Sequence, residues 1–156
     1  MAVRTVSRLL ALASLALLFG CGPTDPTACG TRHRDVELAL RQQRARWNAL
    51  GATTYEYTFE RLCFCPEDIR GPFRVRVENG AIVRTQPAVP ASFPEAVATI
   101  PQAFDIIDEA VDRGACSIDV RYDAATGVPA DVFIDYDQRL ADEEMGFRIS
   151  DVAILR

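Results

Sequence analysis

The sequence predicts a single α+β domain: an antiparallel sheet of five or six strands with two helices packed on one face. Two segments place apolar residues at helical spacing, and six segments show strand patterns. The elements follow one another as helix, three strands, helix, three strands, so each half is one helix followed by a meander. Antiparallel strands with helices gathered on one face define this class, and residues 33–156 are long enough to bury a core.

The first half begins with a helix predicted over residues 33–50. Its apolar stripe repeats every three or four residues, which is the spacing of one helix face, and consists of Val36, Leu40, Gln43, Trp47 and Leu50. Gly51 favours a stop directly after it. We expect Trp47 to be buried between this helix and the sheet.

Residues 53–65 alternate between apolar and polar side chains and predict a half-buried strand. Tyr55, Tyr57 and Phe59 share its apolar face, which we assign to the core and not to a ligand platform. Pro66 ends the strand because proline cannot donate to the ladder. Two further strands, residues 73–78 and 81–85, flank Asn79-Gly80, a dipeptide typical of a type I′ hairpin turn. This hairpin would place Val77 opposite Ile82.

The second half follows a proline-containing loop over residues 87–98. Thr99 and Gln102 form a capping-box pattern that opens the second helix. Its predicted buried stripe is Ile100, Phe104, Ile107 and Val111. Gly114 ends this helix. Three strands follow, over residues 116–123, residues 131–137 and residues 145–154, with a turn at Thr126-Gly127.

The first twenty residues have the pattern of an export signal. Arg4 and Arg8 precede an apolar run over residues 9–19, which is shorter than the roughly 20 residues that a membrane-spanning helix needs. The next residues, Leu18-Phe19-Gly20-Cys21, resemble the bacterial lipobox. That resemblance implies a signal peptide over residues 1–20 and acylation of Cys21. The alternative is an ordinary secretory signal with a chance cysteine.

Residues 21–32 are predicted to be a lipidated cysteine followed by a tether, because they are rich in Pro, Gly and Thr and show no periodicity. The single domain would then span residues 33–156. Gly22 stands where lipoproteins kept in the inner membrane usually have Asp. This favours the outer membrane, with the protein facing the periplasm and attached to the membrane through lipid on Cys21.

The charge pattern argues against a nucleic-acid partner. All 17 basic residues are Arg, set against 22 acids, and the formal net charge is −5. Residues 105–156 alone hold thirteen acids and five Arg. Binding to phosphates requires a basic surface, so we expect no nucleic acid. A protein of the envelope is the expected partner.

Apart from Cys21, the chain has four cysteines: Cys29, Cys63, Cys65 and Cys116. An even number in an exported domain predicts disulfides, with three possible connectivities. Residues two apart in a strand are separated by about 7 Å, whereas the Cβ atoms of a disulfide lie within about 4.5 Å. Cys63 and Cys65 can therefore pair if the strand curls before Pro66, which leaves Cys29 for Cys116. The other connectivities join Cys63 or Cys65 to Cys116.

Other chemistry has weaker support. Cys63 and Cys65 could form a redox dithiol or part of a soft-metal site, but such a site wants further ligands, and His33 is the only histidine. Asp135, Asp137 and the acids at 142–144 resemble half of a calcium loop, but the remaining ligand positions fail the EF-hand pattern. We expect no metal, no cofactor and no catalytic residues.

A series of motifs resembles a bacterial lipoprotein family known as domain of unknown function 6174. The series runs through Trp47, Tyr55-x-Tyr57, Cys63-Phe64-Cys65-Pro66, Asn79-Gly80, Phe104, Tyr122-Asp123, Gly127-x-Pro129, Ile134-Asp135 and Asp142-Glu143-Glu144-x-Gly146. The resemblance implies a secreted or lipid-anchored envelope protein without an established activity. In the family pattern the pair Cys63 and Cys65 is present, whereas Cys29 and Cys116 are an addition of this chain.

Three functional hypotheses follow. The leading one is a lipid-anchored envelope protein whose domain is a non-catalytic binding or interaction module. The alternative is a periplasmic redox or soft-metal-handling protein that uses Cys63 and Cys65. A third is a minor hydrolase that uses the acids near residue 140.

Overall fold

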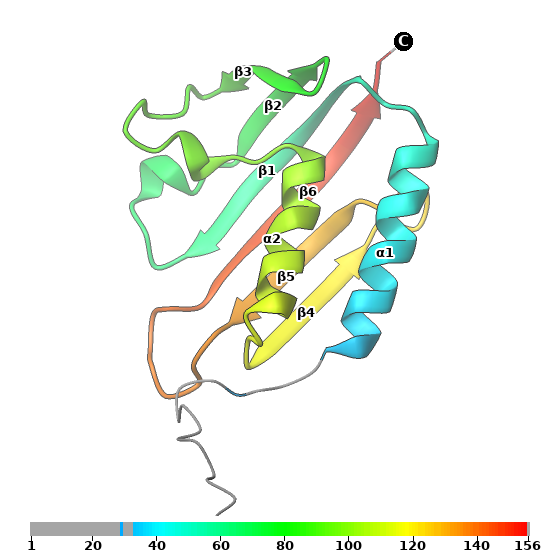
Figure 1. The fold of residues 1–156 in the computed structure, drawn as a ribbon. Helices are drawn as coiled ribbons and strands as arrows, with labels where there is room; N and C mark the ends of the chain where they lie inside the picture. Colours follow the sequence, from blue (N-terminus) through cyan, green and yellow to red (C-terminus); the bar gives the residue numbers. More distant parts are fainter. Residues whose placement is uncertain (1–28, 30–32, 156) are drawn as a thin grey trace, which may run out of the picture.

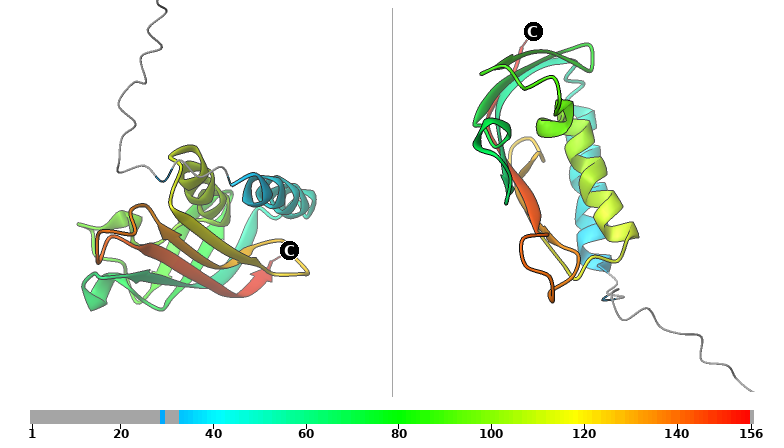
Figure 2. Two further views of the ribbon diagram at one scale, coloured as in Figure 1. Left: turned by 90° about the horizontal axis from the view of Figure 1, so that it is seen from below. Right: turned by 90° about the vertical axis from the view of Figure 1, so that its left-hand side faces the viewer.

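The computed structural model describes Cys29 and residues 33–155. It contains a six-stranded antiparallel sheet and two α-helices, both on the same face of the sheet (Figure 2). The sheet curves around the helices, and its other face is not covered by a helix. The predicted α+β class and the placement of both helices on one face are therefore confirmed.

The elements occur in the predicted order (Figure 1). The first half consists of α1 (Arg34–Ala49), β1 (Thr54–Cys63), β2 (Phe73–Glu78) and β3 (Ala81–Gln86). The second half consists of α2 (Ile100–Asp112), β4 (Ser117–Tyr122), β5 (Pro129–Asp135) and β6 (Met145–Ile154). Short 3₁₀ turns, Glu67–Ile69 and Pro94–Ala96, lie in the loops before β2 and α2.

The strand order in the sheet is β3-β2-β1-β6-β5-β4. The two meanders are therefore joined at the centre by β1 and β6, which are the first and the last strands of the chain. They pair antiparallel from Tyr55 opposite Ile154 to Cys63 opposite Met145. This pairing closes the fold between segments about ninety residues apart in the sequence.

The hairpin between β2 and β3 has the predicted turn. Asn79 and Gly80 have φ values of 50° and 80°, the left-handed conformations that a type I′ turn requires at both central positions. Val77 lies opposite Ile82, as the turn position predicts. The register of this hairpin is thus determined by two residues of local sequence.

The core lies between the inner face of the sheet and the two helices. Its largest fully buried side chains come from both halves of the chain: Tyr55, Tyr57, Phe59, Phe73, Phe104 and Phe147. Trp47 of α1 is 3% exposed and lies on this core, as predicted. In α2 the Thr99 capping box is present in full, and Ile100, Phe104 and Ile107 are completely buried.

Several boundaries differ from the sequence prediction. Leu50 does not continue the buried stripe of α1: it is the C-cap and is 43% exposed, because the chain leaves the helix there and Gly51 adopts a φ of 61°. The first strand ends at Cys63 and not at residue 65, since the chain turns at the cysteine pair. Strand β5 begins at Pro129, before the predicted start, and leaves Tyr136 in the following loop.

The outer face of the sheet carries alternating arginines and acids. Glu56 bonds both Arg74 and Arg76 at 3.0 Å, and Arg148 reaches Glu60 at 2.9 Å. The two hydrogen bonds from these arginines lower the pKa of Glu56. Exposed ion pairs of this kind stabilise a fold little, so this face is a solvated surface and the core contacts lie on the helix side.

Candidate functional site

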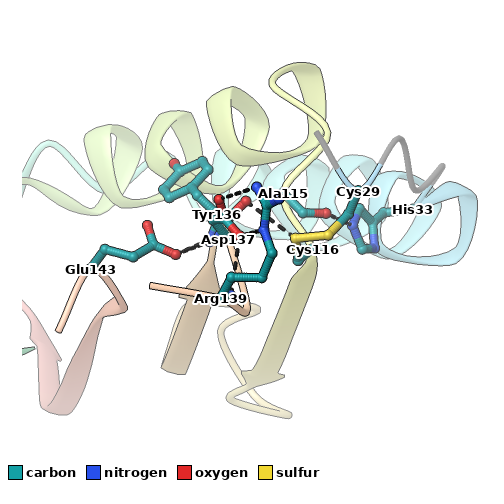
Figure 3. Close-up of a disulfide and its surroundings, with 8 residues drawn as sticks. All are labelled: Cys29, His33, Ala115, Cys116, Tyr136, Asp137, Arg139 and Glu143. Carbon is teal, nitrogen blue, oxygen red and sulfur yellow. Dashed lines mark hydrogen bonds and ion pairs between the residues drawn. A yellow bond between two sulfur atoms is a disulfide. The ribbon is translucent and has the colours of Figure 1, made fainter. Parts of the chain in front are cut away.

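A disulfide joins Cys29 to Cys116, with Cα atoms 4.9 Å apart and a sequence separation of 87 (Figure 3). Cys116 precedes β4, and its amide donates to the carbonyl of Asp135 at the end of β5. Its Sγ also lies 3.2 Å from the carbonyl oxygen of Tyr136. The chain before α1 is therefore bonded to the end of the sheet where β4 begins and β5 ends.

His33 supports the same attachment. Its Nε2 lies 2.7 Å from the carbonyl oxygen of Ala115, the residue directly before Cys116 (Figure 3). The only histidine of the sequence thus joins the start of α1 to the start of β4. This hydrogen bond gives His33 a structural contact at the edge of the domain.

The acids near residue 140 organise the loop between β5 and β6. One carboxylate oxygen of Glu143 accepts hydrogen bonds from the amides of Tyr136 at 2.9 Å and Asp137 at 2.5 Å (Figure 3). Arg139 donates to both carboxylate oxygens of Asp137 at 2.8 Å, and these hydrogen bonds lower the pKa of Asp137 to about 2. Two of the acids named in the calcium and hydrolase hypotheses, Asp137 and Glu143, therefore serve turn geometry.

Asp135 behaves differently from Asp137. Burial raises the pKa of Asp135 above its ordinary value, and the neighbouring Glu143 raises it further.

Across Cys29 and residues 33–155, no group of three or more His, Cys, Asp or Glu side chains is arranged to hold a metal ion.

Cys63 and Cys65 are bonded to each other, with their Cα atoms 5.3 Å apart. This is shorter than the roughly 6.6 Å of two strand rises, so the chain curls as β1 ends, and Pro66 then leads into the Glu67–Ile69 turn. Cys65 packs against the core, whereas Phe64, which lies between the two cysteines in sequence, is 83% exposed. Of the three connectivities that the sequence allows, the structure thus contains Cys63–Cys65 with Cys29–Cys116.

Both disulfides lie at the same end of the sheet. Cys63 is opposite Met145, the first residue of β6, and Met145 is in turn opposite Ile134 of β5. Cys116 bonds the end of β5 from the other side. The C terminus lies at the opposite end (Figure 1).

The aromatic face of β1 belongs to the core. Tyr55, Tyr57 and Phe59 are each 1% exposed or less. The hydroxyl of Tyr57 donates to the carbonyl of Ala98 at 2.5 Å and so holds the segment before α2 against the sheet. Burial raises the pKa of Tyr57 far above its ordinary value. These side chains are inaccessible to a ligand.

A hollow of about 710 Å³ lies beside α2, where no site was expected from the sequence. We call it the α2 groove: it is lined by the start of β3, residues 94–99, the outer side of α2, Arg61 and Met145. Its apolar lining includes Ile82, Val97 and Ile106. In the sequence, the one local signal of this surface was Ile106, an apolar residue outside the predicted buried stripe of the second helix. In the structure Ile106 is half-buried.

The α2 groove is acidic at its border. The carboxylates of Glu95, Asp105 and Glu109 line it. Asp105 pairs with Arg44 at 2.6 Å and Glu109 with Arg113 at 3.5 Å, whereas the Glu95 carboxylate forms no ion pair within the part of the chain that the structure describes. Arg61 is the one basic residue of the lining, and its Nη2 donates to the Glu95 carbonyl at 2.8 Å. The groove therefore combines an apolar lining with one carboxylate, that of Glu95, that has no ion-pair partner among the described residues.

Cys21, the predicted lipidation site, lies outside the described residues, as do residues 1–20 and most of the predicted tether. Within Cys29 and residues 33–155, no helix has the length and apolar character needed to cross a bilayer.

Comparison with known proteins gives one match. The sequence model of a family of unknown function, DUF6174, matches residues 39–154. No curated protein and no solved structure matches the chain. The match covers nearly all of both meanders, including the Cys63–Cys65 disulfide and the α2 groove, and begins after Cys29. The chain therefore belongs to the DUF6174 family.

Proposed function

We propose that the protein is a lipoprotein of the bacterial cell envelope, anchored through acylated Cys21 to the outer membrane and facing the periplasm. Its domain serves as a non-catalytic interaction module for another envelope protein. The proposal rests on the lipobox pattern before Cys21 and above all on the position of the Cys29–Cys116 disulfide. That disulfide bonds the chain to the domain only eight residues after the anchor.

The disulfide limits how far the domain can move from the membrane. Eight residues span at most about 29 Å when fully extended. Without the bond, the next attachment is His33 at the carbonyl of Ala115, and twelve residues could span about 43 Å. The bond also determines where the chain from the lipid anchor meets the domain. It meets the end of the sheet that holds Cys63 and the loop before β6.

The α2 groove is the best candidate for the interaction surface. Its volume and its apolar lining suit the burial of side chains from a partner, and the Glu95 carboxylate at its border has no ion-pair partner among the described residues, whereas Asp105 and Glu109 pair with Arg44 and Arg113. Opposite charges across an interface favour association and exclude partners of like charge. We therefore assign the groove to a protein segment in which apolar residues alternate with Arg or Lys.

The alternative function, a redox or soft-metal-handling protein, divides into two cases. A metal site would need Cys63 and Cys65 as thiolates, but their sulfurs are bonded to each other. Metal binding would therefore require prior reduction. A redox role is compatible with the disulfide as it stands.

The anchor is tested by Cys21→Ser. Two or three acyl chains give stable attachment, whereas one is marginal, so we expect the variant to move from the salt-washed membrane fraction to the soluble or secreted fraction. Metabolic labelling with a fatty acid should mark the parent protein and not the variant. A Cys21→Ser protein that still sediments with salt-washed membranes would refute the lipid anchor.

The interaction role is tested with two synthetic peptides of equal length, one alternating Leu with Arg and the other Leu with Glu. We expect fluorescence anisotropy to detect binding of the Arg peptide only, and Glu95→Arg to weaken it at least about tenfold, since each 1.4 kcal/mol is tenfold in affinity. The matched control is Asp119→Arg, an exposed acid on β4 outside the groove. Equal binding of both peptides, or equal loss in both variants, would exclude the groove.

A further inference from the structure

The two disulfides of this protein make very different contributions to the fold. Cys29–Cys116 closes a loop of 87 residues, whereas Cys63–Cys65 closes a loop of two. The stabilisation that a disulfide provides by restricting the unfolded chain grows with the length of its loop. Restriction of the unfolded chain therefore accounts for Cys29–Cys116 but offers little explanation for Cys63–Cys65.

The turn that contains Cys63–Cys65 is also held by other contacts. The amide of Arg61 donates to the carbonyl of Arg70 at 2.8 Å, and the amide of Ile69 donates to the carbonyl of Pro66 at 3.3 Å. Ile69 is 7% exposed and belongs to the core. Reduction of the disulfide would therefore leave both ends of the turn attached to the domain.

The surroundings of Cys63 are accessible and carry both charges, with Arg61 and Arg70 beside Glu60 and Glu67. Two hollows, of about 450 Å³ and 340 Å³, flank it, and Arg70 lines both. Arg70 forms no ion pair within Cys29 and residues 33–155, although Glu67 also lines the larger hollow. A guanidinium beside a cysteine favours the thiolate, which is the reactive and the departing form in disulfide exchange. The exposed Phe64 ring adds an apolar contact beside the sulfurs.

We propose that Cys63–Cys65 is an exchangeable disulfide that accepts electrons from thiol pairs of exported polypeptides. This role goes beyond the interaction function and uses a different surface from the α2 groove. Cys63 is the sulfur that is attacked, because it lines both hollows, whereas Cys65 lines only the smaller one, packs against the core and leaves as the thiolate.

The exchange is balanced in two steps. A substrate thiolate attacks Sγ of Cys63, the Cys63–Cys65 bond breaks, and a mixed disulfide forms. The second substrate thiolate attacks the substrate sulfur of that mixed disulfide and releases Cys63. Two electrons pass to the protein, the substrate gains a disulfide, and the two substrate protons end on Cys63 and Cys65. Each event consumes one protein disulfide.

The test uses the full lipoprotein in detergent micelles and a reduced synthetic peptide with two cysteines among apolar residues. Acid quenching, alkylation and mass spectrometry follow each disulfide. We expect one peptide disulfide to form for each Cys63–Cys65 pair reduced, while Cys29–Cys116 remains intact. The Cys29→Ser, Cys116→Ser double variant should exchange at the parent rate if it folds.

Three variants separate exchange from a structural role. Cys65→Ser leaves a free Cys63 thiol, which should form a stable mixed disulfide with a peptide that carries a single cysteine and is supplied as its disulfide-linked dimer, because the bound peptide then has no second thiol to release Cys63. Phe64→Ser should slow the reaction with the peptide but not with dithiothreitol. Arg70→Gln should slow the reactions with the peptide and with dithiothreitol by roughly threefold, as expected when the departing thiol becomes more basic.

The proposal is wrong if the peptide reduces Cys63–Cys65 no faster than Cys29–Cys116. It is also wrong if reduction of Cys63–Cys65 alone unfolds the domain, as circular dichroism would show, because the disulfide would then be structural. Neither outcome affects the Cys21 anchor or peptide binding in the α2 groove, so the failure of either proposal can be distinguished from that of the other.

Discussion

The indole ring of Trp47 meets the ring of Tyr55 edge to face, with 5.1 Å between the ring centroids and 85° between the ring planes. Trp47 lies in the last turns of α1, and Tyr55 is the first buried residue of β1. The two rings are 3% and 1% exposed. This contact joins the first helix to the central strand across a connection of four residues.

Replacing the indole should strongly destabilise the domain. Trp47→Ala is expected to lower the free energy of unfolding by about 3–5 kcal/mol, because it leaves a large cavity on the core. Trp47→Phe should lower the free energy of unfolding by less, since it keeps an aromatic contact with Tyr55. Chemical denaturation followed by far-ultraviolet circular dichroism measures both. Leu38→Ala, on the exposed side of the same helix, is the control, and an unchanged midpoint for Trp47→Ala would contradict the core assignment.

The Cys29–Cys116 disulfide should stabilise the domain more than the Cys63–Cys65 disulfide does. Replacing Cys29 and Cys116 by Ser is expected to cost about 2–5 kcal/mol, whereas the same change at Cys63 and Cys65 should cost about 1–2 kcal/mol, as their loop lengths imply. Thermal unfolding of the two double variants under oxidising conditions provides the comparison. Equal losses in the two variants would show that loop length does not govern their stabilities.

Gly146 is required by the close approach of β5 to β6. A Cβ atom at this position would lie 2.2 Å from the backbone carbonyl oxygen of Val132. Gly146→Ala must therefore displace the strand pair, and we expect a loss of several kcal/mol, above the roughly 1 kcal/mol typical of point mutations. Gly51→Ala is the comparison, because its φ of 61° is unfavourable but its Cβ would meet open space. A smaller loss at Gly146 than at Gly51 would be inconsistent with this packing.

Asp135 should make stability depend on pH. Its pKa is raised in the folded state, mainly by burial and then by Glu143, so the folded protein binds this proton more tightly than the unfolded chain. The carboxylate is therefore destabilising above its folded pKa, and this effect is absent below the ordinary Asp pKa of about 3.9.

Asp135→Asn removes that charge while keeping the shape of the side chain. We expect the variant to melt at a higher temperature than the parent at pH 7 and to lose this advantage as the pH falls below about 4. Asp119→Asn, an exposed acid on the adjacent strand β4, is the matched control. An advantage of Asp135→Asn that persists at low pH would mean that the carboxylate charge is not its cause.

The local elements could be predicted from the sequence because each depends on neighbours a few residues away. The capping box of Thr99 and Gln102 begins α2 as predicted, and Asn79-Gly80 produces the expected hairpin register. Leu50 shows the limit of this reasoning. It continues the helical spacing, but the spacing alone does not reveal where the chain leaves the helix.

The sequence by itself determined the helices, the strands, the turns and the membership of the core, because side-chain periodicity and turn residues act locally. Only the tertiary structure decided that β1 pairs with β6, which cysteine faces which, and that β3, residues 94–99 and α2 enclose a groove. These relations join segments far apart in the chain. Their energies come from packing and pairing that exist only when both halves meet, and no local pattern specifies them.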